Sequence, residues 1–473
     1  MWSRDMDSIS RREILLKTGR GFGAVALASL LQGASTDPLA PKVPHAVARA
    51  KSVIYLFMHG GVSHVDTFDP KPELTRRNGQ PLSAELAKTI KTSFIHDPSK
   101  AILRGSPWEF RPGGKSGLLV SDLFSQVREH MDDIAVLRGC YGDVFDHAPA
   151  IYLRNSGSQF PGRPCLGSWV TYGLGTENQN LPAFVVMTDG STKSGPPAYG
   201  AGFLPAVYQG TVFRGGQNPI LYLANPPGVP AAAQKETLDL VGKLDQLHQR
   251  DRVEDTTLEA RISSYELAYR MQSSAPEAVD FASETPATQA LYGIGEPRTD
   301  DFGRKCLLAR RLVERGVRFI QLYSGTNVGE DWDEAHNDLQ ASHTRMAGKT
   351  DRPIAGLLKD LKARGLLDST LVVWGGVFGR TPLSQGKNGR DHHPYGFSMW
   401  MAGGGVKGGQ ALGGTDEFGV QAAELRVDAH DVNATILRLL GLDHERLTYL
   451  YQGRDQRLTD VHGQSEFTKK LLS

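Results

Sequence analysis

The stretch TLVVWGGVFGRTPLSQGKNGRDHHP, residues 370–394, decides the fold class of this chain. Its apolar run 371–374 ends at two glycines, which is typical of a buried strand that stops abruptly. The loop beyond this run carries Arg380, Asp391, His392 and His393. In open α/β sheets ligands bind at the carboxyl ends of the strands, because the loops that follow them converge there. The stretch therefore predicts an α/β protein with a polar site at one edge of its sheet.

The composition is that of a large globular protein without a dominant charge. The chain has 473 residues, and its 53 basic and 52 acidic side chains give a formal net charge of +1. Neither sign is in excess, so nucleic acid and anionic membrane surfaces are not expected as partners. Three cysteines are too few for a disulfide framework, and both one bridge and buried free thiols remain open. They are Cys140, Cys165 and Cys306.

The first 48 residues have the pattern of an export signal. Residues 10–17, SRREILLK, resemble the twin-arginine motif, and the apolar segment GFGAVALASLL follows at 21–31. This segment is too short to cross a bilayer, which takes about 20 apolar residues. It is therefore expected to be the core of a cleaved signal. We expect residues 1–48 to be a twin-arginine signal peptide and leader, with no transmembrane segment in the mature chain and a periplasmic or extracellular location.

Apolar runs alternate with helical patterns along the rest of the chain. Strands are expected at 52–58, 134–137, 181–187, 317–323, 371–374 and 397–402, and helices at 118–131, 302–316, 343–362 and 431–440. A repeated strand–helix–strand order predicts a doubly wound, mainly parallel sheet with helices on both faces. Residues 49–473 are expected to form this domain, with long insertions at 76–117 and 190–300.

Loops after two other predicted strands carry further candidate metal ligands. Asp66 follows the strand at 52–58, together with His59 and His64. It either faces a cation or belongs to an Asx-type turn and cap. Asp333 and His336 follow the strand at 317–323, and a carboxylate three residues before an imidazole suits a divalent cation. The alternative for this pair is an acidic helix N-terminus that matches the helix dipole.

His147 and Arg380 are the candidates for catalysis. His147 stands at the expected start of a helix and would act as general acid and base, or as a nucleophile. The planar fork of Arg380 would hold a sulfate or phosphate group by two parallel hydrogen bonds, or would form a salt bridge that fixes its loop. Lys193 and Arg214, in the Gly- and Pro-rich stretch 190–230, are expected to be solvated surface charges.

Several longer motifs resemble a known family. They are LFMHGGVSHVDTFDPKP at 56–72, GRTP at 379–382, RDHHP at 390–394, WMAGGGVKGG at 400–409 and the tail at 434–463. Together they resemble a family of twin-arginine-exported bacterial proteins that is sulfatase-like, of unknown function, and part of the alkaline phosphatase superfamily. The resemblance implies an alkaline phosphatase-like fold with one or two divalent metals (Zn, Ca or Mg) at the strand ends. It implies as metal ligands Asp66, Asp333, His336, Asp391, His392 and His393, with His147 near the nucleophile position.

The chain departs from this family pattern at three places. Val377 stands where the family usually has Glu, which would remove one metal ligand. The stretch from Cys306 to Arg310 has Leu308 where the sulfatase modification motif has Pro, and no hydroxyl side chain follows His147. The expected function is an exported, metal-dependent hydrolase-like protein that acts on or binds sulfate or phosphate esters, including sulfated glycans. The alternatives are a non-catalytic, metal-containing binding protein for anionic glycans and a structural partner of other exported proteins; the oligomeric state is not indicated.

Overall fold

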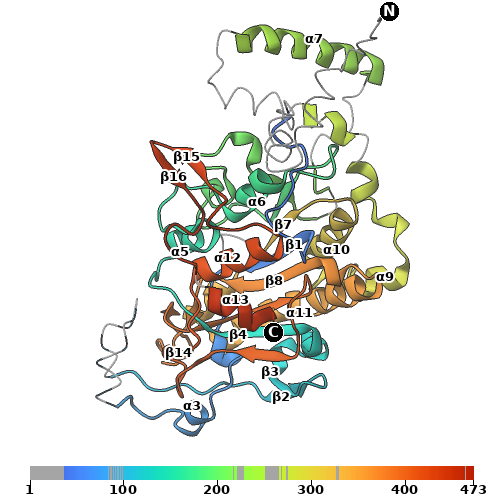
Figure 1. The fold of residues 1–473 in the computed structure, drawn as a ribbon. Coiled ribbons are helices and arrows are strands. Elements are labelled where there is room, and N and C mark those ends of the chain that lie inside the picture. The colour runs from blue at the N-terminus through green and yellow to red at the C-terminus, as the bar shows by residue number, and fades with distance from the viewer. Residues whose placement is uncertain are drawn as a thin grey trace, which may run out of the picture.

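A mixed sheet of eight strands lies at the centre of the molecule (Figure 1). The structure is a computed structural model that describes residues 37–472 except 84, 86–87, 89, 91, 93–94, 96, 98–99, 217, 221–227, 251–265, 268, 273–274, 326–329 and 464. The strands of the sheet are β1 (Ser52–Met58), β4 (Ile134–Cys140), β5 (Phe184–Thr188), β6 (Thr211–Arg214), β7 (Phe319–Ser324), β8 (Thr370–Gly376), β11 (Phe397–Ala402) and β12 (Gln410–Leu412). Across the sheet they lie in the order β12-β4-β11-β8-β1-β7-β5-β6.

All strands of this sheet except β11 run in the same direction. β1 is parallel to β7 and β8, β5 is parallel to β6 and β7, and β12 is parallel to β4. β11 is antiparallel to both of its neighbours, β4 and β8. A parallel connection needs a crossover to the other end of the sheet, whereas the chain between β8 and β11 forms a small ribbon and returns. The predicted doubly wound, mainly parallel α/β fold is confirmed, with β11 as the exception.

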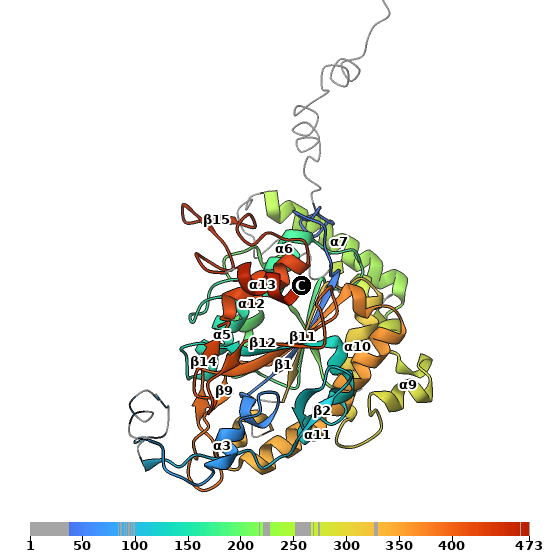
Figure 2. The same ribbon diagram turned by 60° about the horizontal axis from the view of Figure 1, so that its bottom comes forward.

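The side chains of β1 alternate between two apolar cores. Ile54, Leu56 and Met58 belong to the core under α10 (Asp300–Glu314) and α11 (Leu339–Ala363). Val53, Tyr55 and Phe57 belong to the other core, because successive side chains of a strand point to opposite faces. The helices of this second face are α5 (His147–Ser156), α6 (Leu166–Leu174), α12 (Ala429–Leu439) and α13 (Ser465–Leu472). Figure 2 shows the two groups of helices on opposite sides of the sheet, as the sequence predicted.

Shorter elements surround this core. Further helices include α3 (Pro72–Arg76), α7 (Ala231–Arg250) and α9 (Pro286–Leu291). Small ribbons pair β2 (Phe110–Gly113) with β3 (Leu118–Ser121), β9 (Gly379–Arg380) with β10 (His392–His393), β13 (Gly414–Thr415) with β14 (Ala422–Glu424), and β15 (Tyr449–Tyr451) with β16 (Arg454–Gln456). The helix predicted at 118–131 was wrong. Residues 118–121 pair with β2 across a turn that contains Gly114 and Gly117, both at positive φ, and the following residues form 3-10 turns.

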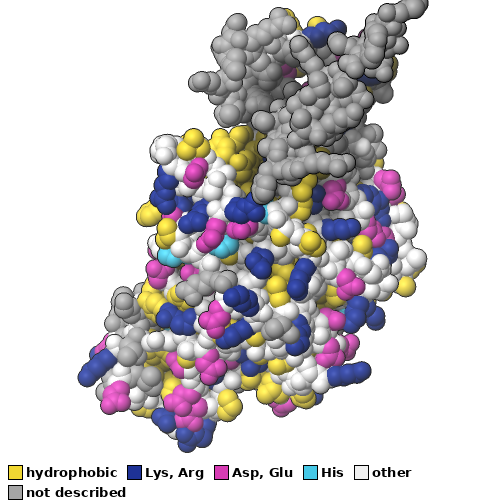
Figure 3. Space-filling model, viewed as in Figure 1, with side chains coloured by type: hydrophobic (Ala, Val, Ile, Leu, Met, Phe, Trp, Pro, Cys, Tyr) yellow, Lys and Arg dark blue, Asp and Glu magenta, His cyan; other side chains and the backbone are white. Residues whose placement is uncertain are grey.

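The predicted signal peptide lies mostly outside the described residues, which begin at residue 37. The end of the predicted leader lies against the domain, where the Lys42 N–H donates to the Leu174 carbonyl and the Ala46 N–H to the Gly441 carbonyl. Within the described part of the chain, no helix is both long and apolar enough to cross a membrane. Acidic and basic side chains are interspersed over the face shown in Figure 3.

Candidate metal centre

Loops from five strands meet at one edge of the sheet. His59 follows β1, His147 begins the helix after β4, and Lys193 lies in the loop after β5. The loop after β7 carries Asp331 and Asp333, and the ribbon β9–β10 follows β8. These five strands are mutually parallel, so the loops all leave from carboxyl ends, where ligand sites of open α/β sheets form.

The Asp333 carboxylate is the centre of this site. Its Oδ1 atom lies 2.9 Å from His147 Nε2, 2.9 Å from His392 Nε2 and 3.3 Å from His336 Nε2. Arg380 Nη2 lies 2.8 Å from the same oxygen. A carboxylate oxygen offers about two lone-pair directions, so four nitrogen atoms cannot all donate to it with good geometry. Such crowding of imidazole nitrogens is the arrangement expected around a cation.

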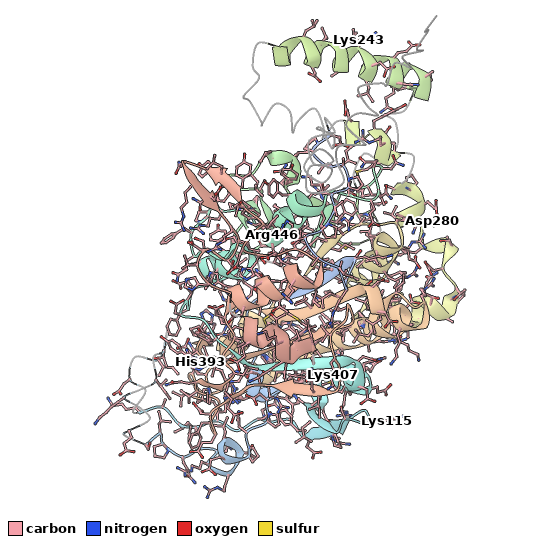
Figure 4. All side chains as sticks on the ribbon, viewed as in Figure 1. Lys115, Lys243, Asp280, His393, Lys407 and Arg446 are labelled. Atoms are coloured by element: carbon pink, nitrogen blue, oxygen red, sulfur yellow. The ribbon has the colours of Figure 1, made fainter. Side chains whose placement is uncertain are left out.

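The ribbon β9–β10 brings Arg380 and His392 together. The two residues are register partners, and both contact Asp333. His393 is the next residue of β10, and successive side chains on a strand point to opposite faces. Its Nε2–H donates to the Val420 carbonyl, and its ring stacks on His64 with centroids 6.2 Å apart. Figure 4 shows His393 beside the segment that carries β14.

The backbone at Gly60 explains how closely the loops pack. Gly60 has a φ of +109°, and a Cβ atom there would lie 2.5 Å from the Asp333 nitrogen. Only glycine allows both this conformation and this approach. The Trp332 N–H donates to the His59 carbonyl at 3.0 Å, and the Asp333 N–H donates to Asp331 Oδ1 at 2.9 Å. The position of Asp333 is therefore set by backbone contacts with the loop after β1.

The titration of these groups favours neutral imidazoles facing an ionised carboxylate. Burial lowers the pKa of His147 to about 4 and the pKa of His392 to about 2. Burial opposes the ionisation of Asp333, but the surrounding imidazoles and the Arg380 guanidinium outweigh it and hold the pKa of this carboxyl far below its usual range. Neutral imidazole nitrogen and ionised carboxylate oxygen are the forms that bind metals.

The residues present fit a divalent cation. One ligand atom each from His147, Asp333 and His392 lies within 4.8 Å of the other two. Both ring nitrogens of His147 are buried and make no hydrogen bond of acceptable geometry with any described residue. His336 stands next to this group, with its Nε2 2.7 Å from His392 Nε2. Its Nδ1–H donates to Gln385 Oε1 at 2.5 Å, which holds the ring with Nε2 directed toward the group.

Lys193 belongs to the site, and the expectation that it is a solvated surface charge was wrong. Its Nζ lies 2.5 Å from Asp333 Oδ2 and 3.1 Å from Asp331 Oδ2, and its backbone N–H donates to His59 Nε2 at 3.1 Å. Asp331 Oδ2 is also 3.3 Å from His59 Nδ1. The signal available in the sequence was a lone cation in a glycine-rich loop directly after a predicted strand, and that pattern does not reveal its partner.

Two other predicted ligands, Asp66 and Asp391, have protein partners. Arg390 binds Asp66 by two hydrogen bonds, from Nε to Oδ2 at 2.8 Å and from Nη2 to Oδ1 at 3.1 Å. Asp391 accepts from the backbone N–H of His392 at 2.7 Å and of Ile95 at 3.1 Å. The structure thus brings together Asp333, His336 and His392 with His147 and Arg380, and it directs Asp66, Asp391 and His393 to other contacts.

Arg380 makes the contacts of a residue that fixes its loop. Its side chain is fully buried and donates to the carbonyls of Gly60, Gly61 and Trp332, as well as to Asp333. Of the two roles open from the sequence, these contacts favour the structural one, because few of the guanidinium donors remain for a substrate.

The departures from the family pattern have clear positions in the structure. Val377 is buried in the apolar core, and the next residue, Phe378, packs its ring on His147 and His392 with centroid distances of 4.9 and 4.5 Å. Cys306 is buried within α10. All three cysteines are free thiols.

A family profile and several solved structures are similar to this chain. The sequence profile of DUF1501, described as a protein of unknown function, matches residues 50–467. No curated protein matches the chain. Among solved structures the chain is similar to PsFucS1 sulfatase from Pseudoalteromonas sp., with 12% identity, a TM-score of 0.40 and coverage of 95% of this chain and 75% of that one.

Two further structures are similar at the same level. The lipoteichoic acid synthase LtaP from Listeria monocytogenes has 9% identity and a TM-score of 0.37, over 90% of this chain and 79% of that one. A mutant of TAB5 alkaline phosphatase with Mg bound has 11% identity and a TM-score of 0.36, over 84% of this chain and 99% of that one.

Proposed function

We propose that this chain, which belongs to DUF1501, a family of proteins of unknown function, is an exported, metal-dependent hydrolase of sulfate or phosphate esters. The observation that carries the proposal is the convergence of His147, Asp333 and His392, whose ligand atoms lie within 4.8 Å of one another. Two imidazoles and one carboxylate form the donor set of many catalytic zinc sites, which keep a position open for water or substrate.

The donor set also bears on the identity of the metal. Ca²⁺ and Mg²⁺ prefer oxygen ligands, whereas imidazole suits Zn²⁺ and other transition metals. With His336 beside the group, three imidazoles stand around one carboxylate. Zn²⁺ is therefore the cation that this site fits best among Zn²⁺, Ca²⁺ and Mg²⁺.

The residues around the ligands have separate tasks in such a reaction. A bound divalent cation would polarise an ester oxygen and lower the pKa of a coordinated water. Lys193, whose ammonium group lies between Asp331 and Asp333, would offer its remaining N–H donor to an anionic ester oxygen. Phe378 covers the two imidazoles and keeps water from their faces. Arg380 and Gln385 hold Asp333 and His336 in place.

Replacement of His147 tests the proposal. We expect His147→Ala to lower metal affinity and the hydrolysis of aryl sulfate or aryl phosphate together, each by at least about 100-fold, because it removes a ligand and the loss of a residue that only orients a ligand already costs about 10–100-fold. The matched control is His462→Ala, which removes an exposed histidine and should leave both quantities unchanged. The measurements are metal content of the purified protein and initial rates on the two esters.

Two outcomes of this comparison would contradict the hydrolase proposal. Equal rates in the wild type and in His147→Ala would place catalysis elsewhere. A wild type that holds one equivalent of metal and hydrolyses neither ester would favour the non-catalytic binding protein, an alternative that the absence of a hydroxyl side chain next to His147 supports.

Export by the twin-arginine route is the second part of the proposal. It is supported by the residues SRREILLK at 10–17 and the apolar segment at 21–31. We expect an Arg11→Lys, Arg12→Lys variant to stay in the cytoplasm while the wild type is found outside it, as measured by cell fractionation and immunoblotting. Equal export of both proteins would exclude this route.

A further inference from the structure

A cavity of about 780 Å³ opens at the same edge of the sheet as the metal centre. Thr188 and Arg214 line it, and they are register partners at the carboxyl ends of the parallel strands β5 and β6. Glu330 also lines it and directly precedes Asp331, whose carboxylate contacts Lys193. Glu330 and Asp331 are neighbours in the chain, so their Cα atoms are about 3.8 Å apart. The loop after β7 therefore contributes residues both to the cavity and to the metal centre.

The order of the strands sets the distance between the two sites. β6 lies two strands away from β7 in the sheet. Neighbouring strands are separated by about 4.8 Å, so the ends of β7 and β6 lie about 10 Å apart along the edge. A molecule that contacts both sites must be longer than a simple ester. A cavity of this size can hold a ligand of a few ring units.

Two arginines give the cavity its free positive charge. Arg214 and Arg298 line it and are exposed, and neither makes an ion pair or side-chain hydrogen bond with any residue that the structure describes. The lining carboxylates have cationic partners: Glu330 pairs with Lys349 at 3.0 Å, and Asp189 and Asp301 both pair with Lys305. The two guanidinium groups are thus available to bind an anion, to which their planar fork is suited.

The carboxylates restrict what kind of anion can bind. Asp189, Asp301 and Glu330 keep carboxylate oxygens at the cavity although lysines pair with them, and these oxygens would disfavour a densely charged chain such as polyphosphate. They would accept hydrogen bonds from hydroxyl groups. A molecule with widely spaced anionic groups and many hydroxyl groups between them satisfies both the arginines and the carboxylates, and this is the chemistry of a sulfated oligosaccharide.

From this arrangement we infer that the cavity beside Arg214 and Arg298 is a subsite for a second sulfate group of an oligosaccharide whose reacting ester lies at Asp333. The inference rests on the proposed function for the identity of the reacting group, and it deepens that proposal by naming the substrate as an oligomer. Inorganic sulfate or an aryl ester would occupy the metal centre alone.

Binding measured without turnover tests the subsite. The probe is a chondroitin sulfate tetrasaccharide, titrated calorimetrically into the zinc-loaded protein at two salt concentrations. We expect an Arg214→Ala, Arg298→Ala variant to bind it about 10-fold more weakly than the wild type, because two charge-assisted contacts are lost, and to show a smaller salt dependence. The matched control is Arg446→Ala, which removes an exposed arginine elsewhere on the surface (Figure 4) and should not change the affinity.

Further measurements make the test specific. An Arg214→Lys, Arg298→Lys variant keeps the charge but loses the planar fork, so its affinity should lie between those of the wild type and the double alanine variant. A loss of affinity through misfolding would not be rescued in this way. Tripolyphosphate should bind more weakly than the tetrasaccharide. Equal tetrasaccharide affinity of the wild type and the double alanine variant, or stronger binding of tripolyphosphate, would overturn the inference. Failure of hydrolysis would leave this binding result standing, and failure of the subsite would leave the proposed hydrolysis standing.

Discussion

Replacing Asp333 by Asn is expected to lower the affinity of the protein for Zn²⁺ by more than about 100-fold. Loss of a residue that only orients a metal ligand costs about 10–100-fold in affinity, and Asp333 is itself a proposed ligand. Asn keeps the size of the side chain and one oxygen atom, but it removes the negative charge on which three imidazoles converge. Hydrolysis of aryl sulfate or aryl phosphate should fall with the metal. The measurement is a zinc titration against a chelating dye, with circular dichroism to confirm that the variant is folded.

The control for this variant is Asp69→Asn. Asp69 is a buried aspartate that pairs with Lys71 at 3.1 Å outside the group of converging ligands, whereas Asp333 is half-buried. We expect the Asp69→Asn variant to bind zinc with the same affinity as the wild type. Equal zinc affinity of Asp333→Asn and the wild type would show that the imidazoles gather around this carboxylate for a structural reason.

Replacing Asp66 by Ala is expected to destabilise the fold by about 3–5 kcal/mol, the cost of leaving one charge of a buried ion pair without its partner. Asp66 and Arg390 are both fully buried, and two hydrogen bonds join them. Ser63 Oγ also donates to Asp66 Oδ2, at 2.5 Å. Urea unfolding of the variant and the wild type measures the change in the free energy of unfolding.

A second replacement separates charge burial from other effects. The Asp66→Ala, Arg390→Met variant should be more stable than Asp66→Ala alone, because no unpaired charge is left in the interior. For comparison, Asp133→Ala breaks an exposed pair with Lys362 and should cost at most about 1 kcal/mol. If Asp66→Ala proved as stable as Asp133→Ala but lost the metal, Asp66 would be a ligand, as the family resemblance implied.

The sequence predicted the sheet edge and part of the site for good physical reasons. Apolar runs that end in glycine marked β1 and β8, and parallel strands bring their carboxyl ends to one edge. Loops that leave this edge are expected to bring Asp333 near His392 and His147. The sequence pattern does not tell which of several polar residues on a loop face inward, and Asp391, His392 and His393 illustrate this: the two-residue strand β10 turns His392 toward Asp333 and His393 away from it.

The local sequence pattern could not predict which distant side chains become partners in the fold. The pairing of Asp66 with Arg390 joins residues 324 positions apart, and that of Lys193 with Asp333 joins residues 140 positions apart. Each side chain alone is compatible with a ligand, a cap or a surface charge. The antiparallel direction of β11 was missed for a related reason, since only the path of the β9–β10 ribbon shows that the chain does not cross to the other end of the sheet.

The most direct test of the metal centre is a crystal structure of the zinc-loaded protein with anomalous diffraction data collected at the zinc absorption edge. We expect one strong anomalous peak about 2.0–2.2 Å from a ring nitrogen of His147, from His392 Nε2 and from a carboxylate oxygen of Asp333. The absence of a peak at this position, or a peak bound instead by Asp66, Asp391 or His393, would contradict it.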